Sequence, residues 1–171
     1  MEYTLAENST VDFTAHAPMH TFKGWAIRGL RGKINIDFEQ LSLHHAQVTL
    51  ETRYLDTGDN DKNRAMRNFF KLDQHPETGF VMTECRELCQ LKNNKYKMTV
   101  LGILDFVSIR RQLPITAMLT VQKEKIIMDL HFKWSFKAYG LKPPRLLFMT
   151  VRDIVDIKAH LEFIQDNTEE E

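Results

Sequence analysis

A period-two alternation of apolar and polar residues is the strongest constraint on how this chain folds. Between Met128 and Phe136 every second residue is apolar, and the residues between them are polar. The segment from Val155 to Phe163 repeats the pattern. Successive side chains of an extended strand point to opposite faces, whereas a helix would scatter these residues around its circumference. Both segments are therefore predicted to be strands with one buried face and one solvent-exposed face.

Shorter runs of the same kind cover most of the remaining chain. Turn-forming residues separate them, notably at Asn93-Asn94 and at 123–125. The further predicted strands are 11–16, 22–26, 33–38, 48–53, 80–88, 96–104 and 115–121. About eight or nine short antiparallel strands indicate a sandwich or a barrel, and a barrel removes exposed sheet edges most completely. The pattern therefore favours an all-β antiparallel barrel over a sandwich.

Two segments depart from the strand pattern. Residues 60–70 place Ala65, Met66, Phe69 and Phe70 at helical spacing, and Asp59 or Asn60 is a suitable cap. This single short helix is expected at a barrel end, either gating the mouth or serving as a structural plug. The stretch 139–151, which contains Pro143-Pro144, is expected to fold over a barrel end or to pack outside the barrel.

Length and charge narrow the classes of protein. With 171 residues, of which 43% are hydrophobic, the chain suits one domain, predicted over 1–165, followed by an acidic, disordered tail over 166–171. The chain has 23 Lys plus Arg and 23 Asp plus Glu. It therefore has no net positive charge that would favour binding to nucleic acid. No apolar run has the length of a membrane span. The N-terminus does not resemble a signal peptide, so a cytoplasmic location is expected, or a periplasmic one if a leader was removed.

Sequence motifs for catalysis or metal binding are not found. The chain has no phosphate-loop, dinucleotide-binding or nucleophile-elbow motif. Cys85 and Cys89 are expected to be reduced thiols, since a strand would hold them too far apart for a disulfide. His16 and His20 lie at the end of the first predicted strand. Two histidines without a third nearby ligand are too few for a typical metal site. We therefore predict no catalytic residue, no metal and no cofactor.

Basic residues gather at Arg28, Arg31 and Lys33. Such charges at strand ends often serve only solubility. Alternatively they neutralise a phosphate head group at a barrel mouth, where Arg can bind in bidentate fashion. His16, Arg28 and Arg31 are the candidate head-group contacts.

The order of short motifs along the chain resembles that of the YceI-like family of lipid-binding, lipocalin-like proteins. The similarity runs through nearly the whole chain. The residues that carry it are Val11-x-Phe13-x-x-His16, Phe22-x-Gly24, Gly32-x-Ile34-x-Ile36-Asp37-Phe38, Leu55-Asp56-Thr57-Gly58, Met66-Arg67, Phe69-Phe70, Pro76, Phe80, Val100-x-Gly102-x-Leu104, Tyr139-Gly140-Leu141 and Val151-x-Asp153-x-Val155-x-Ile157.

This resemblance implies an all-β, eight-stranded antiparallel, lipocalin-like barrel that is hollow and has no enzymatic activity. Its apolar pocket would hold an amphiphilic lipid such as a polyisoprenoid, a quinone precursor or a fatty-acid derivative. Two alternatives remain: a filled barrel that acts as a protein-interaction module, and an enzyme of small amphiphiles with His16 as acid or base. The sequence also leaves open whether the chain forms a homodimer. The residues expected to line the pocket are Phe22, Trp25, Met66, Phe70, Phe80, Met82, Met98, Leu130, Phe132 and Trp134.

Overall fold

The computed structural model describes residues 1–146 and 148–167. Within these residues it contains one α-helix, α1 (Asn60–Phe70), and two short 3-10 helices, η1 (Thr52–Tyr54) and η2 (Lys137–Tyr139). The strands are β1 (Glu2–Leu5), β2 (Thr10–Ala17), β3 (His20–Ala26), β4 (Leu30–Asp37), β5 (Ser42–Glu51), β6 (Glu77–Lys92), β7 (Lys95–Phe106), β8 (Ile109–Gln122), β9 (Lys125–Ser135), β10 (Arg145–Leu146), β11 (Met149–Thr150) and β12 (Ile154–Gln165). No helix in the described ranges is long and apolar enough to cross a membrane.

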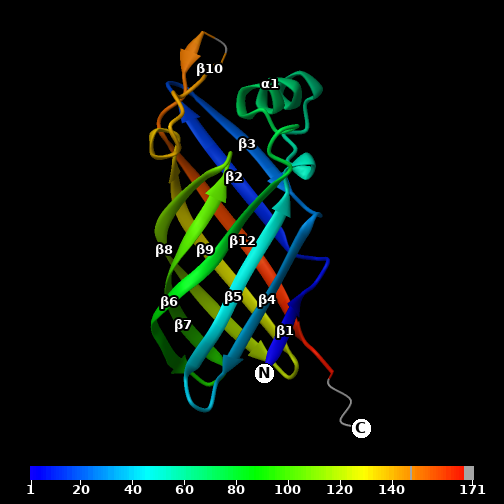
Figure 1. Ribbon diagram of the computed structural model, residues 1–171, viewed down its shortest axis with the longest axis vertical. Helices are drawn as coiled ribbons and strands as arrows, with labels where there is room; N and C mark the ends of the chain where they lie inside the picture. The colour runs from blue at the N-terminus through cyan, green and yellow to red at the C-terminus, as the bar shows by residue number, and fades with distance from the viewer. Residues whose placement is uncertain (147, 168–171) are drawn as a thin grey trace.

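Eight of these strands close into an antiparallel barrel, as the sequence predicts. Their order is β1-β4-β5-β6-β7-β8-β9-β12, and β12 returns to pair with β1. The closing strand is short: Tyr3 lies opposite Ile34 of β4 and Gln165 of β12. The N- and C-terminal strands thus seal the barrel at the end where both termini lie (Figure 1).

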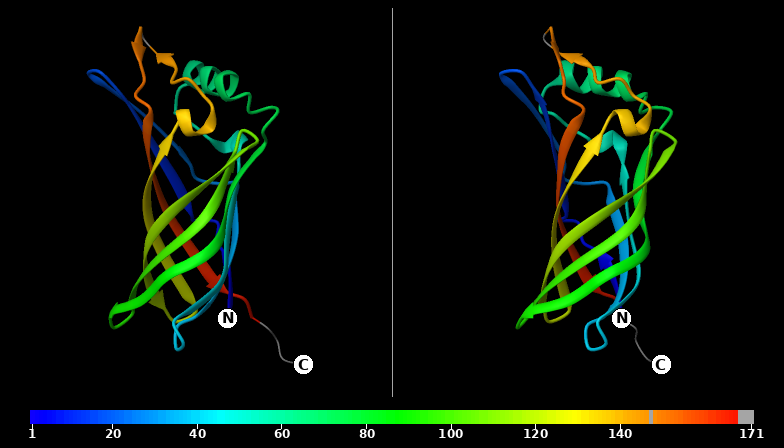
Figure 2. Two further views of the ribbon diagram at one scale, coloured as in Figure 1. Left: turned by 60° about the vertical axis from the view of Figure 1, so that its left-hand side comes forward. Right: turned by 90° about the vertical axis from the view of Figure 1, so that its left-hand side faces the viewer.

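At the opposite end, which we call the mouth end, three further elements stand around the barrel. The β2–β3 hairpin continues the sheet beyond β12, with Ala15 opposite Val155. The helix α1 and the small β10–β11 hairpin lie over the same end, as Figures 1 and 2 show. The stretch 139–151 therefore folds over a barrel end, one of the two arrangements expected.

The far edge of the β2–β3 hairpin is held by a single bridge. Trp25 of β3 exchanges two backbone hydrogen bonds of 2.8 Å with Asp56, in the loop that leads to α1. This bridge ties the hairpin to the segment that positions the helix. Apart from this bridge, β3 pairs only with β2 among the described strands.

The part of the barrel nearest the termini is filled by side chains. Its buried core includes Tyr3, Ile34, Met98, Ile126 and Phe163. These residues come from strands spread around the whole barrel, as expected for inward positions of a closed sheet. A filled interior therefore exists, but only in the half of the barrel remote from α1.

Strand β6 breaks the simple alternation. Its pairing with β7 shifts register at three places along the strand, each a β-bulge or irregularity. Because a bulge adds a residue on one strand only, side chains beyond it change face. Cys85 packs against the core, whereas Cys89 lies opposite Lys97, and both thiols are free. The four-residue spacing of the cysteines therefore does not place them on one face.

The predicted acidic tail falls mainly on residues 168–171, which lie outside the described residues. Asp166 contacts the body of the protein: its carboxylate accepts a 2.6 Å hydrogen bond from Thr4 Oγ1, and its backbone N–H donates to Glu2.

Candidate functional site

A cavity of about 450 Å³ occupies the half of the barrel nearest the mouth end. Inward residues of β2, β3, β9 and β12 form much of its wall, and one face of α1 covers it. The wall is apolar along most of its length. A cavity of this size lies within the range of about 300–1,000 Å³ that is usual for small-molecule sites.

Two glycines keep aromatic rings flat against the wall. The ring of Phe13 on β2 lies over Gly24 of β3, where any Cβ would clash with it. The ring of Phe80 lies in the same way over Gly102 of β7. Since each ring occupies the space that a side chain would need, it lies along the sheet instead of projecting across the lumen. This arrangement preserves the hollow interior.

The helix α1 begins at the predicted cap. Asp59 has an extended backbone, and its carboxylate accepts a 2.9 Å hydrogen bond from the backbone N–H of Lys62. From this start, Met66, Phe69 and Phe70 share the face that lines the cavity. The helix ends at Lys71 in the left-handed conformation. Asp59 therefore fixes which face of the helix covers the lumen.

Asn63 holds the first turn of α1 onto the preceding loop. Its amide oxygen accepts hydrogen bonds from the backbone N–H and the hydroxyl of Thr57, at 2.8 and 2.7 Å. Its amide nitrogen donates to Asp56 at 2.9 Å. This hydrogen bond, together with one from the N–H of Gly58, lowers the pKa of Asp56. Asn63 is one of the buried polar side chains, and both ends of its amide are used.

An aromatic cluster forms the wall beneath α1. The ring of Phe70 lies 6.0 Å from that of Phe136 and 6.1 Å from that of Trp134. Trp134 also lies 5.4 Å from Tyr139, whose hydroxyl donates to the Leu104 carbonyl at 2.9 Å. Burial raises the pKa of Tyr139 to about 12, so this hydroxyl stays protonated and can donate its hydrogen bond to Leu104. The cluster thus anchors the helix to the barrel through ring contacts.

One polar atom in this wall is unsatisfied. The indole nitrogen Nε1 of Trp134 is buried and has no hydrogen-bond partner among the described residues. A buried donor without a partner costs free energy, so such groups are uncommon in native proteins. Trp134 also lines the cavity.

Seven of the ten side chains expected to line a pocket lie on this cavity wall. They are Phe22, Met66, Phe70, Phe80, Leu130, Phe132 and Trp134. The structure places the other three elsewhere. Met82 and Met98 belong to the packed core of the terminal half. Trp25 faces outward and packs beneath Gly58, because it lies an odd number of residues from the inward-facing Phe22.

The three residues expected to contact a head group all lie off the cavity wall. His16 faces outward and binds Asp156, with 2.7 Å between Nε2 and Oδ2. Arg31 pairs with Glu77 at 2.9 Å, and Arg28 lies over the ring of Tyr54. The cations that do line the cavity are Lys23, Lys62 and Arg145, and none of the described carboxylates lines it.

Sequence reasoning missed Lys62 and Arg145, although signals for both existed. Lys62 precedes Met66 by one helical turn and so shares its face. Its ammonium lies 5.7 Å from the centre of the Phe22 ring. Arg145 belongs to the stretch 139–151 that broke the strand pattern.

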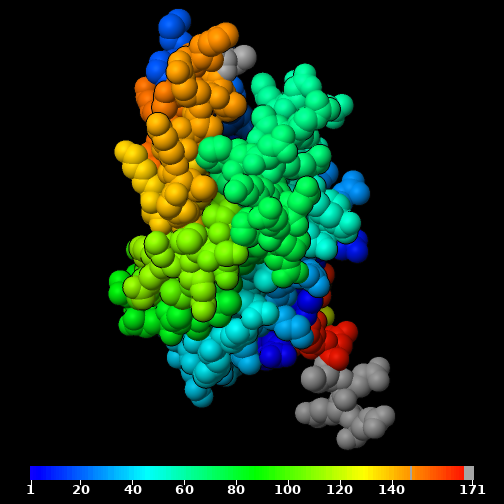
Figure 3. All heavy atoms as spheres, turned by 45° about the horizontal axis from the view of Figure 1, so that its top comes forward, coloured from blue at the N-terminus to red at the C-terminus, as the bar shows by residue number. Residues whose placement is uncertain are grey.

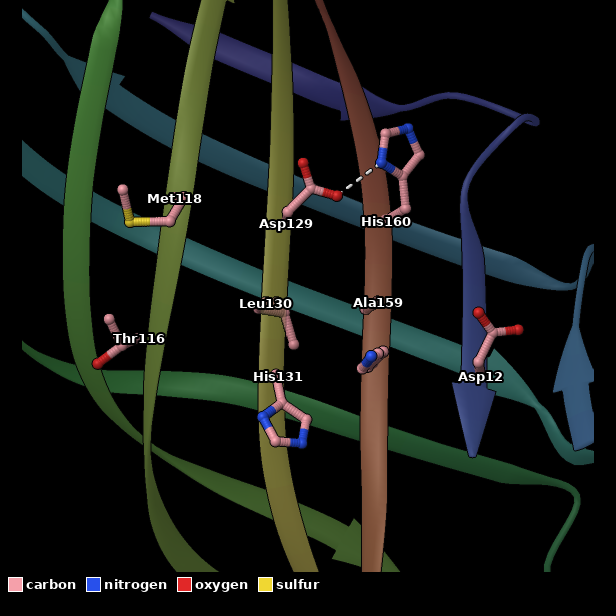
Figure 4. Close-up of a pocket in the computed structure, with 9 residues that line it drawn as sticks. Asp12, Thr116, Met118, Asp129, Leu130, His131, Ala159 and His160 are labelled. Atoms are coloured by element: carbon pink, nitrogen blue, oxygen red, sulfur yellow. Dashed lines mark hydrogen bonds and ion pairs between the residues drawn. The ribbon is translucent and has the colours of Figure 1, made fainter. Parts of the chain in front are cut away.

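A second depression lies on the outside of the barrel over β8, β9, β12 and β2 (Figure 4). His160 and Asp129 face each other there, with 2.7 Å between Nδ1 and Oδ1. Further along the same face, His131 lies 3.3 Å from Asp156, whose pKa is lowered chiefly by its hydrogen bond with His16. Within 1–146 and 148–167, no group of three or more His, Cys, Asp or Glu is placed to hold a metal ion.

The family follows from a comparison with known protein families. The model of the YceI-like domain matches residues 3–163. The chain belongs to the YceI-like family. The barrel, the mouth-end helix and the cavity of this YceI-like protein all lie within the matched residues. No curated protein sequence matches it.

Solved structures share the fold of this YceI-like protein at low sequence identity. A polyisoprenoid binding domain from Saccharophagus degradans, implicated in plant cell wall breakdown, is 15% identical, with a TM-score of 0.76 over 96% of this chain and 98% of that one. BcnA of Burkholderia cenocepacia is 19% identical, with a TM-score of 0.73 over 90% and 95% of the two chains. The YceI protein of Campylobacter jejuni is 16% identical, with a TM-score of 0.64 over 81% and 82%. These similarities establish the fold.

Proposed function

We propose that this YceI-like protein binds and carries an amphiphilic lipid, without catalysing a reaction on it. The observation that carries the proposal is the apolar cavity of about 450 Å³ in the mouth half of the barrel. A buried methylene contributes roughly 0.8 kcal/mol, so about ten methylenes would contribute ~8 kcal/mol before ordering costs. The apolar chain alone would supply most of the affinity.

The proposed ligand class is a polyisoprenoid, a quinone precursor or a fatty-acid derivative. The solved polyisoprenoid binding domain supports the first of these through its similar fold. The wall supports the class more generally, since Met66 and several phenylalanines line it. Met side chains are flexible and polarisable, and they adapt to chains of different shape.

The polar part of the ligand is proposed to lie near the mouth end. Lys62 and Arg145 would contact an anionic or strongly polar head group there. Lys62 lies on the cavity-facing side of α1, and Arg145 belongs to the segment that folds over the same end. Lys62 and Arg145 replace His16, Arg28 and Arg31 as proposed polar contacts.

Neither alternative function gains support from a specific observation. The enzyme hypothesis requires His16 to point into the lumen, whereas His16 binds Asp156 on the outer face. The interaction-module hypothesis requires a filled barrel, whereas side chains fill only the terminal half. Lipid binding is therefore the function that the geometry favours.

Two substitutions at neighbouring positions of β2 test the proposal. Ala15 lines the cavity, whereas Thr14 faces outward. Ala15→Phe should fill part of the lumen, and displacing about two methylenes would lower affinity for a fluorescent fatty acid roughly tenfold. Thr14→Phe is the matched control and should bind like the wild type.

The same pair is compared after purification without added lipid, by solvent extraction and mass spectrometry. The wild type and Thr14→Phe should carry a stoichiometric amphiphile, and Ala15→Phe should carry much less. Equal binding by both variants would argue against the cavity as the binding site. Absence of both a carried amphiphile and fluorescent-lipid uptake in the wild type would refute the proposed function.

A further inference from the structure

Two hairpin tips at the mouth end expose large apolar side chains to solvent. Met19, between β2 and β3, is 100% exposed, and Phe148, between β10 and β11, is 95% exposed. They are the most exposed large hydrophobic residues among those that the structure describes, and the next is the N-terminal Met1 at 61%. Both hairpins project from the same end of the barrel (Figure 2).

Neither side chain is explained by folding. Both residues adopt a left-handed backbone, with φ of 63° at Met19 and 65° at Phe148. A bulky side chain in this conformation costs free energy that Gly or Asn would avoid. These side chains lie in water and do not pack against the described protein. Burial of apolar surface therefore does not offset the cost of the backbone conformation. Other turns of this protein share the left-handed backbone, so the near-complete exposure of these two apolar side chains is the feature that points to a role outside the folded chain.

Positive charge is concentrated around these tips. The segment 137–153 contains Lys137, Lys142, Arg145 and Arg152, but one acidic residue, Asp153. The carboxylate of Asp153 is already engaged: it accepts hydrogen bonds from Ser135 Oγ and the N–H of Lys137. Because the whole chain has no net charge, this end is locally basic while other parts are acidic.

The helix α1 adds to this charge. It carries Lys62, Arg64 and Arg67 against Asp61 and the capping Asp59. Figure 3 shows α1 and the β10–β11 segment on the two sides of a hollow at the mouth end, with the blue β2–β3 segment behind it. The apolar tips and the basic residues therefore surround the same opening.

We propose that the mouth end docks on an anionic lipid surface. Met19 and Phe148 insert among the lipid head groups, the basic residues contact their anionic groups, and the cavity opening faces the bilayer. Apolar residues combined with Lys and Arg are the features of reversible interfacial binding. The inference rests on the proposed function, because a lipid surface is the source or acceptor of the ligand that the cavity would carry.

Vesicle flotation of the full chain tests the docking. The vesicles are phosphatidylcholine with or without phosphatidylglycerol. The wild type should float with the phosphatidylglycerol vesicles, and added salt should weaken this binding. The double variant Met19→Ser/Phe148→Ser should bind roughly tenfold more weakly, because partial burial of two large apolar side chains is lost.

Leu41→Ser is the matched control. Leu41 is also a partly exposed apolar residue in a left-handed turn, with φ of 50°, but it lies in the β4–β5 loop at the opposite end. This variant should float like the wild type, and restoring an apolar residue with Met19→Ser/Phe148→Leu should recover part of the binding. A wild type that does not float, or a double variant that floats equally well, would overturn the docking proposal and favour a protein partner for the tips.

Uptake of a fluorescent fatty acid from solution separates this inference from the proposed function. The double variant should take up the lipid as the wild type does, but should acquire it more slowly from vesicles. Uptake without flotation refutes the docking alone. Flotation without uptake refutes the lipid-carrying function while the docking surface stands.

Discussion

At the scale of single residues, Asn63 connects the fold to the site. Its amide bridges Asp56 and Thr57 in the loop before α1, and the helix it anchors forms one wall of the cavity. Asp56 also holds β3 through its bridge with Trp25. One amide therefore orders both elements that border the opening.

Replacing Asn63 by Asp should destabilise the protein in a pH-dependent way. An aspartate keeps the acceptor for Thr57 but loses the donor to Asp56 and adds a second negative charge beside it. In the wild type the lowered pKa of Asp56 stabilises the fold above its unfolded pKa, and this contribution is lost as pH falls through the lower folded pKa. At neutral pH Asn63→Asp should lower the melting temperature by a few degrees.

Protonation of one carboxyl should relieve this repulsion, so the deficit of Asn63→Asp should shrink as the pH is lowered into the acidic range. Melting temperature measured from neutral to acidic pH checks the effect. Asn68→Asp, which makes the same charge change at an exposed position of α1, is the control. A deficit that is the same at all pH values would mean that the Asp56–Asn63 hydrogen bond is not the cause.

The alternation of side chains between the two faces of a strand explains which of the expected pocket residues lie on the cavity wall. Phe22, Gly24 and Ala26 share the more buried face of β3, and Trp25 lies on the other face, where it packs beneath Gly58. The apolar–polar alternation predicts which face of the strand a residue lies on. It does not predict the position of that residue along the barrel axis. Met98 has the correct face and nevertheless lies in the packed half. The height depends on strand register and stagger, which one sequence does not reveal.

At the scale of elements, the two glycine–phenylalanine contacts control whether the lumen is open. Both join residues of adjacent strands, Phe13 with Gly24 and Phe80 with Gly102. The ring shields the glycine backbone, and the glycine leaves room for the ring. Neither residue type alone predicts this arrangement from the sequence, because the partner depends on strand pairing.

Gly24→Ala should narrow the cavity. The added Cβ would clash with the Phe13 ring, so the ring must swing toward the lumen that it now borders. Displacement of about two ligand methylenes would weaken fluorescent-lipid binding roughly tenfold. Gly24→Ala/Phe13→Leu removes the displaced ring and should recover binding, which a titration of both variants measures. Wild-type affinity in Gly24→Ala would show that the ring position does not limit the lumen.

Other elements were predictable from local signals to different degrees. The helix 60–70 and its cap Asp59 agree with the structure because capping and helical spacing are local properties. The bulges of β6 were missed, because the alternation of that segment weakens without showing where residues are added. The short strand β1 was also missed, since its role in closing the barrel depends on the distant β4 and β12.

At the scale of the whole molecule, the barrel is divided into a packed half and a hollow half. Side chains of the terminal half form a continuous core, which gives the fold stability independent of any ligand. The mouth half has fewer strand contacts around β3, an unpartnered indole donor and a cavity. The limited pairing of β3 and the cavity make this half suited to admit a ligand.

Two depressions compete as the site of a bound amphiphile: the internal cavity and the external one over β8, β9, β12 and β2. Leu130 and Ala159 belong to both linings, but their neighbours on the same strands belong to one lining each. On β9, Phe132 faces the cavity and His131 faces outward. On β12, Ile157 faces the cavity and Lys158 faces outward. A chemical label at neighbouring residues therefore distinguishes the two sites.

The most direct test of a lipid chain inside the barrel is photolabelling with a fatty acid that carries a diazirine near its chain end. Peptide mass spectrometry then locates the modified residues on β9 and β12. Binding in the cavity predicts adducts on Phe132, Ile157 or other inward residues, and their suppression by excess unlabelled fatty acid. Adducts confined to His131, Lys158 and other outward residues would contradict the account.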